Sequence, residues 1–237
     1  MKNEIIIAGY KSKYFNFFQG EKATLYFQVS RKNKNGSYDN FDCMAFGETA
    51  EKLNAVEPGK PVRITGRLSS RVTEKDGVKN KNVKVLISGF KTPEEGEWNS
   101  TAVISGTKGK YEKCFKDNNP LLYFQVISKT QKGFEAHDCV AFGNTAIDIE
   151  NIEAGTPIEV TGRLSTRVVE KDGVKTKKVN VICNSFETFE KKVYQPTDAD
   201  TSDPASDPAP ESSDYTPCAD DFVNIDDDID DIELPFN

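Results

Sequence analysis

Residues 42–85, DCMAFGETAEKLNAVEPGKPVRITGRLSSRVTEKDGVKNKNVKV, return 96 residues later as residues 138–181, DCVAFGNTAIDIENIEAGTPIEVTGRLSTRVVEKDGVKTKKVNV. When each stretch is extended by one residue, to residues 41–85 and 137–181, the two are identical at 26 of 45 positions. The repeat also extends upstream, because LYFQV stands at residues 25–29 and again at residues 122–126. A period of this length exceeds the roughly 20 to 50 residues of solenoid repeats, so it indicates a duplicated domain.

Each copy has the pattern of a small β-barrel. Val62, Ile64 and Leu68 alternate with polar residues, which is typical of a strand with one buried face. Asp-Gly pairs at residues 76–77 and 172–173 suit hairpin turns. One short helical stretch follows the third strand of each copy. This order predicts a five-stranded Greek-key barrel, the oligonucleotide-binding (OB) fold. The expected class is all-β: two tandem OB-fold barrels, each with one short helix, followed by a disordered acidic tail.

The charge is divided sharply along the chain. Residues 1–192 carry 31 basic and 24 acidic side chains, a balance of +7, whereas residues 193–237 carry 14 acidic side chains and none that is basic. A basic body favours an anionic polymer as partner, and the Pro-, Ser- and Asp-rich end cannot bury enough apolar surface to fold. The expected segments are residues 1–92 (OB-fold domain 1), 93–100 (linker), 101–190 (OB-fold domain 2), 191–223 (disordered linker) and 224–237 (acidic docking tip).

Several classes of protein are disfavoured by the sequence. No apolar run approaches the roughly 18 to 20 residues of a membrane span, and the amino-terminal apolar stretch is too short for a signal peptide, so we expect a cytoplasmic protein without a membrane partner. Five cysteines without a C-x-x-C pair fit reduced thiols rather than zinc. The lone histidine, His137, corresponds to Phe41 in the first copy, and no catalytic motif is present. We therefore expect neither an enzyme nor a metal or cofactor.

Basic residues recur on the polar side of one strand. Arg67 and Arg71 return as Arg163 and Arg167, whereas Arg63 is replaced by Glu159. A solvated face would also explain such charges, but the retention of both positions favours binding to a nucleic-acid backbone. The expected basic contacts are Arg31, Lys32, Lys34, Arg67 and Arg71 in the first copy and Lys129, Lys132, Arg163 and Arg167 in the second.

Aromatic residues offer surfaces on which bases could stack. Phe46 and Phe142 stand immediately before the glycine that opens each helix, where a ring could equally belong to the core. Tyr26 and Tyr123 alternate with core-facing residues, so they should point outward, either as stacking platforms or as ordinary surface tyrosines. Trp98, between the two copies, is interpreted as packing the linker against a barrel.

The order of these motifs resembles that of the bacterial single-stranded DNA-binding protein family. The resemblance rests on IIIAGY (5–10), LYFQVSR (25–31), FDCMAFGETAEKL (41–53), VRITGRLSSR (62–71) with the EKDG hairpin, and LPF (234–236). It implies that Phe46 and Phe142 stack on bases, and that two-barrel chains form a homodimer. Two further stacking positions of the family fall here on Asn40 and Thr73, and on Ala136 and Val169, so the tyrosines are the expected substitutes.

The same resemblance implies that the acidic tip docks replication and repair enzymes. The residues expected to do so are Asp230, Asp231, Ile232, Leu234, Pro235 and Phe236. Asn237 departs from the family, whose chains normally stop at the phenylalanine. The expected function is sequence-tolerant binding of single-stranded DNA in replication, recombination and repair, in a bacterial cytoplasm or nucleoid, from a host, phage or mobile-element gene. An OB-fold RNA-binding or chaperone protein, and a protein-interaction adaptor, remain alternatives.

Overall fold

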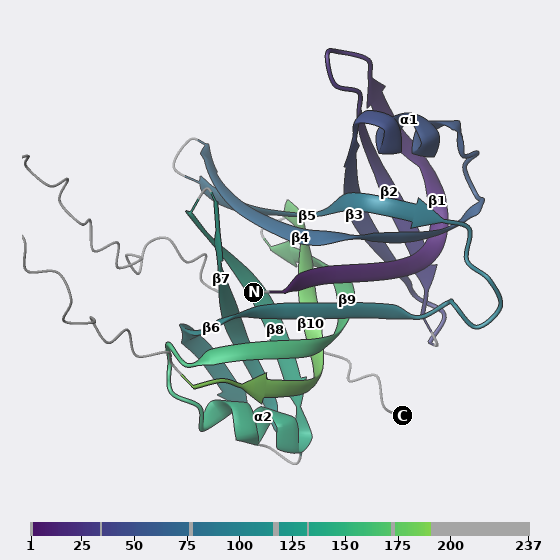
Figure 1. Cartoon of the computed structure of the whole chain (residues 1–237). Coiled ribbons are helices and arrows are strands. Elements are labelled where there is room, and N and C mark those ends of the chain that lie inside the picture. The colour runs from purple at the N-terminus through teal and green to yellow at the C-terminus, as the bar shows by residue number, and fades with distance from the viewer. Residues whose placement is uncertain are drawn as a thin grey trace, which may run out of the picture.

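The computed structural model describes residues 2–33, 35–75, 78–115, 119–131, 133–171 and 174–190 (Figure 1). The first half of the chain forms β1 (Asn3–Phe18), β2 (Thr24–Lys32), β3 (Tyr38–Phe46), α1 (Gly47–Ala55), β4 (Pro61–Lys75) and β5 (Val78–Lys91). The second half forms β6 (Ser100–Phe115), β7 (Leu121–Thr130), β8 (Gly133–Phe142), α2 (Gly143–Glu150), β9 (Pro157–Lys171) and β10 (Val174–Thr188). No helix in these described ranges is long and apolar enough to cross a membrane.

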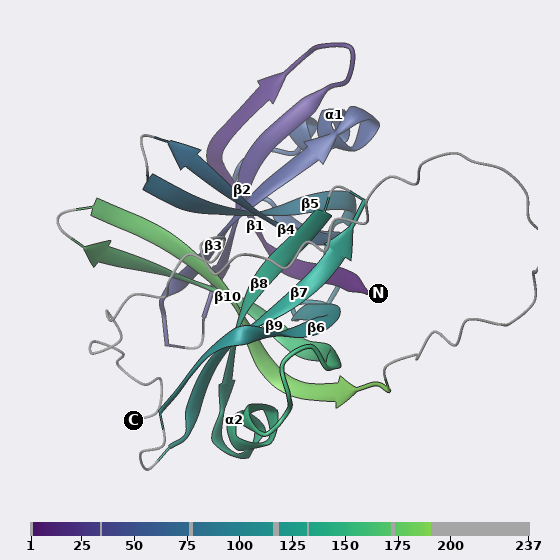
Figure 2. The same ribbon diagram turned by 90° about the vertical axis from the view of Figure 1, so that its left-hand side faces the viewer.

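Each half closes into a five-stranded barrel. In the first, β1 pairs with β2 and β4, β2 pairs with β3, β3 runs parallel to β5, and β5 pairs with β4. In the second, β6 to β10 repeat this ring of pairings. The two helices lie at opposite ends of the molecule (Figures 1 and 2). The expected all-β class with two OB-fold barrels is therefore confirmed.

The alternation that predicted the strands corresponds to the observed core. Val62, Ile64 and Leu68 are at most 2% exposed. The T-G-R triplet that both copies share faces a bulge in each barrel, at Ser88 of β5 and at the equivalent Asn184 of β10. A Cβ atom on Gly66 would lie 2.2 Å from the carbonyl oxygen of Leu86, and one on Gly162 would lie 1.8 Å from that of Ile182. Only glycine allows this approach of two backbones, which explains why the triplet recurs.

A buried lysine holds the end of the helix in each barrel. Lys11 is 1% exposed, and its Nζ atom donates to the carbonyl oxygens of Leu53, Asn54 and Val56 at 2.9, 3.2 and 2.6 Å. Lys108, its counterpart, bonds the carbonyl oxygens of Glu150 and Ile152 at 3.3 and 2.6 Å. These bonds satisfy carbonyl groups that a helix leaves without partners at its carboxyl end.

Replacing Lys11 by methionine should lower the free energy of unfolding by about 2 kcal/mol, because charge-assisted bonds to carbonyl oxygens are lost while the packing volume is kept. Denaturant unfolding of the full chain measures the change. Lys13→Met is the matched control, since Lys13 is exposed, and it should stay within about 0.5 kcal/mol of the unchanged chain. Equal stability of the two variants would show that the lysine is dispensable as a cap.

The two barrels are joined by strand pairing as well as by the linker. β1 pairs antiparallel with β6, from Asn3 opposite Ile104 to Ile7 opposite Ser100, so that all ten strands belong to one sheet. Two ion pairs related by the repeat cross the joint: Lys81 contacts Asp138 at 2.6 Å and Lys177 contacts Asp42 at 2.7 Å. Each long hairpin therefore packs beside the third strand of the other barrel. We call this region the inter-barrel joint.

The other segment predictions stay untested by the structure. Residues 191–237, with the expected linker and docking tip, lie outside the described residues. So do two of the predicted basic contacts, Lys34 and Lys132.

Candidate nucleic-acid interface

Three aromatic rings gather on the outer face of the first barrel. Because Leu25 and Phe27 point into the core, Tyr26 between them points outward. The rings of Phe18 and Tyr26 meet edge to face with their centroids 5.9 Å apart. Phe18 and Phe46 are 58% and 37% exposed, so both rings are accessible.

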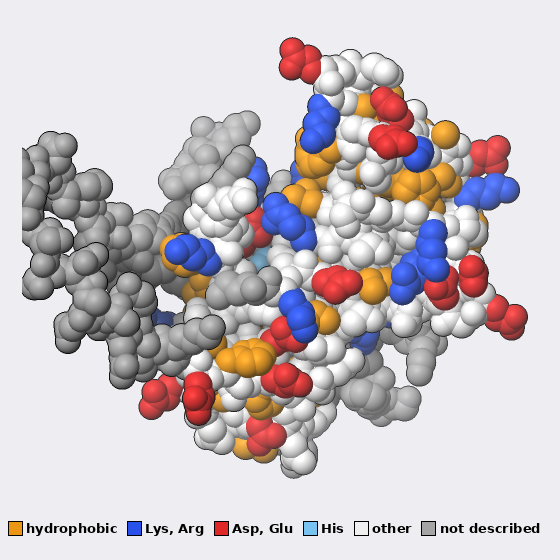
Figure 3. All heavy atoms as spheres, in the orientation of Figure 1, with side chains coloured by type: hydrophobic (Ala, Val, Ile, Leu, Met, Phe, Trp, Pro, Cys, Tyr) orange, Lys and Arg blue, Asp and Glu red, His pale blue; other side chains and the backbone are white. Residues whose placement is uncertain are grey.

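Lysine side chains lie over these rings. The Nζ atom of Lys84 is 4.9 Å from the centre of the Tyr26 ring, and that of Lys22 is 5.5 Å from the centre of the Phe46 ring. We call Phe18, Tyr26 and Phe46, with Lys22 and Lys84, the ring groove. Figure 3 shows hydrophobic and basic side chains side by side on the first barrel.

A hollow of about 450 Å³ adjoins Tyr26 and Lys84. Lys13, Tyr14, Phe15 and Asn16 from the end of β1 also line it. Tyr14 and Phe15 are 66% and 40% exposed, which extends the accessible aromatic surface. Flat rings flanked by cations can bind an unpaired base by stacking and its phosphate by charge.

Three of the predicted arginines, Arg31, Arg67 and Arg163, lie at the inter-barrel joint. The Nη1 atom of Arg67 is 3.7 Å from the Oε2 atom of Glu135 in the other barrel, and that glutamate is only 8% exposed. Arg31 lies close to both Asp39 and Arg163. Burial lowers the pKa of Arg31, the charge of Asp39 raises it, and the charge of Arg163 lowers it further. Arg71 is exposed on the hairpin, and Arg67 is exposed as well. The structure thus brings Arg31 and Arg163 together.

The corresponding face of the second barrel is covered. Tyr123 does point away from the main core, but it is only 4% exposed and forms a separate small cluster with Leu121 and Val140. Phe142 packs partly buried against that cluster. The guanidinium group of Arg167 lies 5.7 Å from the centre of the Tyr123 ring. Burial raises the pKa of the Tyr123 hydroxyl, and the charge of Arg167 opposes this increase.

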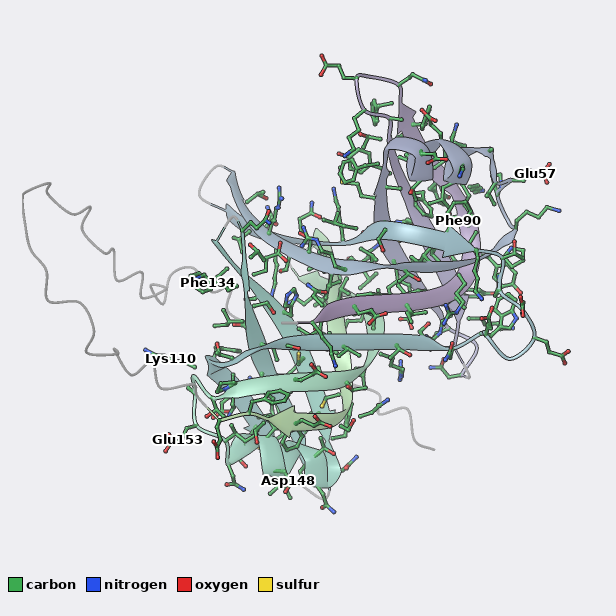
Figure 4. All side chains as sticks on the ribbon, in the orientation of Figure 1. Glu57, Phe90, Lys110, Phe134, Asp148 and Glu153 are labelled. Atoms are coloured by element: carbon green, nitrogen blue, oxygen red, sulfur yellow. The ribbon has the colours of Figure 1, made fainter. Side chains whose placement is uncertain are left out.

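The remaining predicted lysines lie at the ends of two hairpins. Lys32 is paired with Tyr38, and Lys129 with Phe134, in register across the strands. Both lysines are exposed, as are Tyr38 and Phe134, which are 57% and 52% accessible. Figure 4 shows Phe134 projecting away from the barrel at the end of the hairpin.

Five residues of this surface were not predicted from the sequence: Phe18, Lys22, Tyr38, Lys84 and Phe134. A signal for Tyr38 was available, because it has the same strand parity as Phe46, and every second residue of β3 points outward. The lysines gave no comparable signal. Lys22 precedes β2, and Lys84 comes from β5, so only the closed barrel brings them to the rings.

The lone histidine is a core residue. His137 is 1% exposed, and neither ring nitrogen has a hydrogen-bond partner among the described residues. Burial, together with nearby Lys81, lowers the pKa of His137 to about 4. Burial also raises the pKa of the Cys183 thiol to about 12, so this thiol is unreactive. Within the described ranges, no group of His, Cys, Asp or Glu side chains is arranged to hold a metal ion.

Trp98 lies beside Tyr10 with ring centroids 5.3 Å apart. Both rings remain 45% exposed. This contact agrees with the interpretation of Trp98 as a residue that packs the linker against the first barrel.

Comparison with known proteins agrees with the architecture. Residues 13–92 match the model of the single-strand binding protein family. The chain is similar to the wild-type single-stranded DNA binding protein from Thermus aquaticus, with a TM-score of 0.66 and 16% identity over 82% of this chain and 96% of that chain. A deletion mutant of that protein gives a TM-score of 0.64 and 17% identity over 83% and 98% of the two chains. The search of curated proteins finds no significant match. The resemblance inferred from the motifs is thereby confirmed, and the chain carries a domain of the single-strand binding protein family at residues 13–92.

Proposed function

We propose that this protein binds single-stranded DNA with little preference for sequence. The observation that carries the proposal is the ring groove, where Phe18, Tyr26 and Phe46 lie beside Lys22 and Lys84 on one face of a closed barrel. Two comparisons support the proposal: residues 13–92 match the single-strand binding protein family, and the chain is similar to a single-stranded DNA binding protein.

The chemistry of the groove favours unpaired bases. Stacking on a side-chain ring needs a free base face, which a duplex keeps covered by the neighbouring base pair. Every base has such a face, so this contact tolerates any sequence. Lysines then add an attraction for phosphates that does not depend on sequence.

Competition binding tests the proposal. Labelled poly(dT) bound to the full chain is challenged with equal lengths of unlabelled poly(dT), RNA and duplex DNA at two salt concentrations. We expect poly(dT) to compete best, and the logarithm of affinity to fall with the logarithm of salt by about 0.7 per neutralised phosphate. Equal competition by duplex would overturn the proposal, preference for RNA would favour the RNA-binding alternative, and no binding of any polymer would favour the adaptor.

The acidic tip extends the proposal to replication, recombination and repair in a bacterial cytoplasm or nucleoid. Residues 226–231 are acidic at five of six positions, and Leu234, Pro235 and Phe236 follow. An acidic approach steers a basic-rimmed partner, and an aromatic side chain can anchor in an apolar pocket. We propose that this tip recruits replication and repair enzymes.

Deleting residues 224–237 should preserve or strengthen binding of poly(dT), because the chain loses negative charge that competes with DNA for the basic body. The same deletion should abolish the capture of purified replication and repair enzymes on the immobilised protein. A Phe236→Ala variant separates the anchor from the charge and should lose most of the capture. Capture that survives both changes would make the tail a solubilising segment only.

We also propose that two chains form a homodimer with four barrels. The two-barrel architecture supports this, because it places in one chain what single-barrel relatives would supply from two. Light scattering of the free protein should give the mass of two chains. The mass of one chain would contradict the proposal.

A further inference from the structure

The two barrels differ at the positions that form the ring groove. With the repeat offset, Lys22 corresponds to Asn119, and Lys84 corresponds to Asn180. The two lysines of the ring groove are therefore absent from the second barrel, where Lys113 and Arg167 lie over the rings of Phe115 and Tyr123 instead. Thr24 corresponds to Leu121, which adds apolar volume beside the tyrosine.

The rings themselves remain, but their environment changes. Phe18, Tyr26 and Phe46 correspond to Phe115, Tyr123 and Phe142. Whereas Phe18 is 58% exposed, Phe115 is partly buried against a cluster in which Leu121, Tyr123 and Val140 are 7%, 4% and 3% exposed. We call these residues the closed counterpart of the ring groove.

An arginine also covers the tyrosine of the second barrel. Arg167 interacts with both the ring and the hydroxyl group of Tyr123. Its equivalent in the first barrel, Arg71, is exposed, and Tyr26 is contacted instead by Lys84. A base that stacked on Tyr123 would have to displace Arg167 and separate packed apolar side chains. A base that stacks on Phe18 meets a ring that is 58% exposed.

We infer that bases stack in the ring groove of the first barrel and not in its closed counterpart on the second. This inference rests on the proposed binding of single-stranded DNA and makes it asymmetric. The second barrel contributes to the same complex through its cations and its exposed hairpin end, where Lys129 and Phe134 are accessible. The duplication has thus produced two faces with the same fold and different roles.

Photochemical cross-linking of the full chain tests the inference. A thymine-rich oligonucleotide containing 5-iododeoxyuridine forms adducts with aromatic side chains on which the modified base stacks, and peptide mapping locates them. We expect adducts at Phe18, Tyr26 or Phe46 and none at Phe115, Tyr123 or Phe142. Similar yields in both barrels, or a complex without adducts in the ring groove, would overturn the inference. The absence of any complex would instead count against the proposed function.

Matched variants provide a second measurement. Phe18→Leu should weaken binding of poly(dT) about tenfold, which is within the range for the loss of one stacked base. Phe115→Leu should change it less than twofold, because an apolar side chain still fills the cluster. Thermal midpoints of both variants show whether each chain is folded. Equal losses of affinity in two folded variants would contradict the asymmetry.

Discussion

The double variant Tyr26→Ala, Phe46→Ala is expected to bind poly(dT) about 100-fold less tightly than the unchanged chain. Each stacked base contributes roughly 1 to 3 kcal/mol, and about 1.4 kcal/mol corresponds to a tenfold change in affinity. Both rings lie on the outer face of the barrel, and Phe46 is 37% exposed. The thermal midpoint should therefore stay close to that of the unchanged chain, and fluorescence anisotropy of a labelled oligonucleotide measures the affinity.

Phe189→Ala is the control for the loss of an exposed ring. Phe189 is 48% exposed at the end of the second barrel, outside the ring groove. This variant should bind poly(dT) as the unchanged chain does. If the double variant kept full affinity, the ring groove would not be the binding surface. If its thermal midpoint collapsed, the two rings would be part of the core.

Acid should destabilise the protein through His137, and His137→Phe should remove this effect. The folded state keeps the imidazole neutral with a pKa of about 4, whereas the unfolded chain takes up a proton near pH 6.5. The unfolded state then binds more protons between these values, so the free energy of unfolding falls as pH is lowered. The contribution of His137 is fully present above pH 6.5, and about 3 kcal/mol is lost by pH 4.

The internal repeat suggests both the substitution, His137→Phe, and its reciprocal control, Phe41→His. Phe41 is the equivalent residue of the first barrel and is 1% exposed, so a phenylalanine suits this place in the core. His137→Phe should make the denaturation midpoint less dependent on pH between 7 and 4. The reciprocal Phe41→His should increase that dependence. The groups facing His137 are Lys81, Arg67 and Asp138, and all three remain in both variants. An unchanged pH profile in His137→Phe would assign the effect to carboxylates.

The sequence predicted the strands because alternation is a local property. Val62, Ile64 and Leu68 are buried as expected, and the repeated T-G-R triplet marks a place where two backbones touch. Tyr26 and Phe46 point outward for the same local reason. A period of two is enough to decide which face of a strand a residue occupies.

The roles of the arginines could not be derived in this way. Arg67 and Arg71 share one face of β4 and both are exposed, yet Arg67 also lies 3.7 Å from Glu135 of the other barrel. The difference arises from a partner 68 residues away, which no local pattern reveals. The burial of Tyr123 could not be derived locally either. Its sequence context matches that of Tyr26, but Arg167 covers it from the adjacent hairpin.

The pairing of β1 with β6 and the two ion pairs between the barrels fix one barrel against the other, so the connection is not a flexible hinge. If the peptide chain were cut between β1 and β6, these contacts would still hold the two halves together, as an interface holds two subunits. A polynucleotide that passes from one half to the other meets a single preorganised platform. Two flexibly tethered modules lose orientational entropy when they bind one ligand together. In this protein that entropy has already been lost during folding.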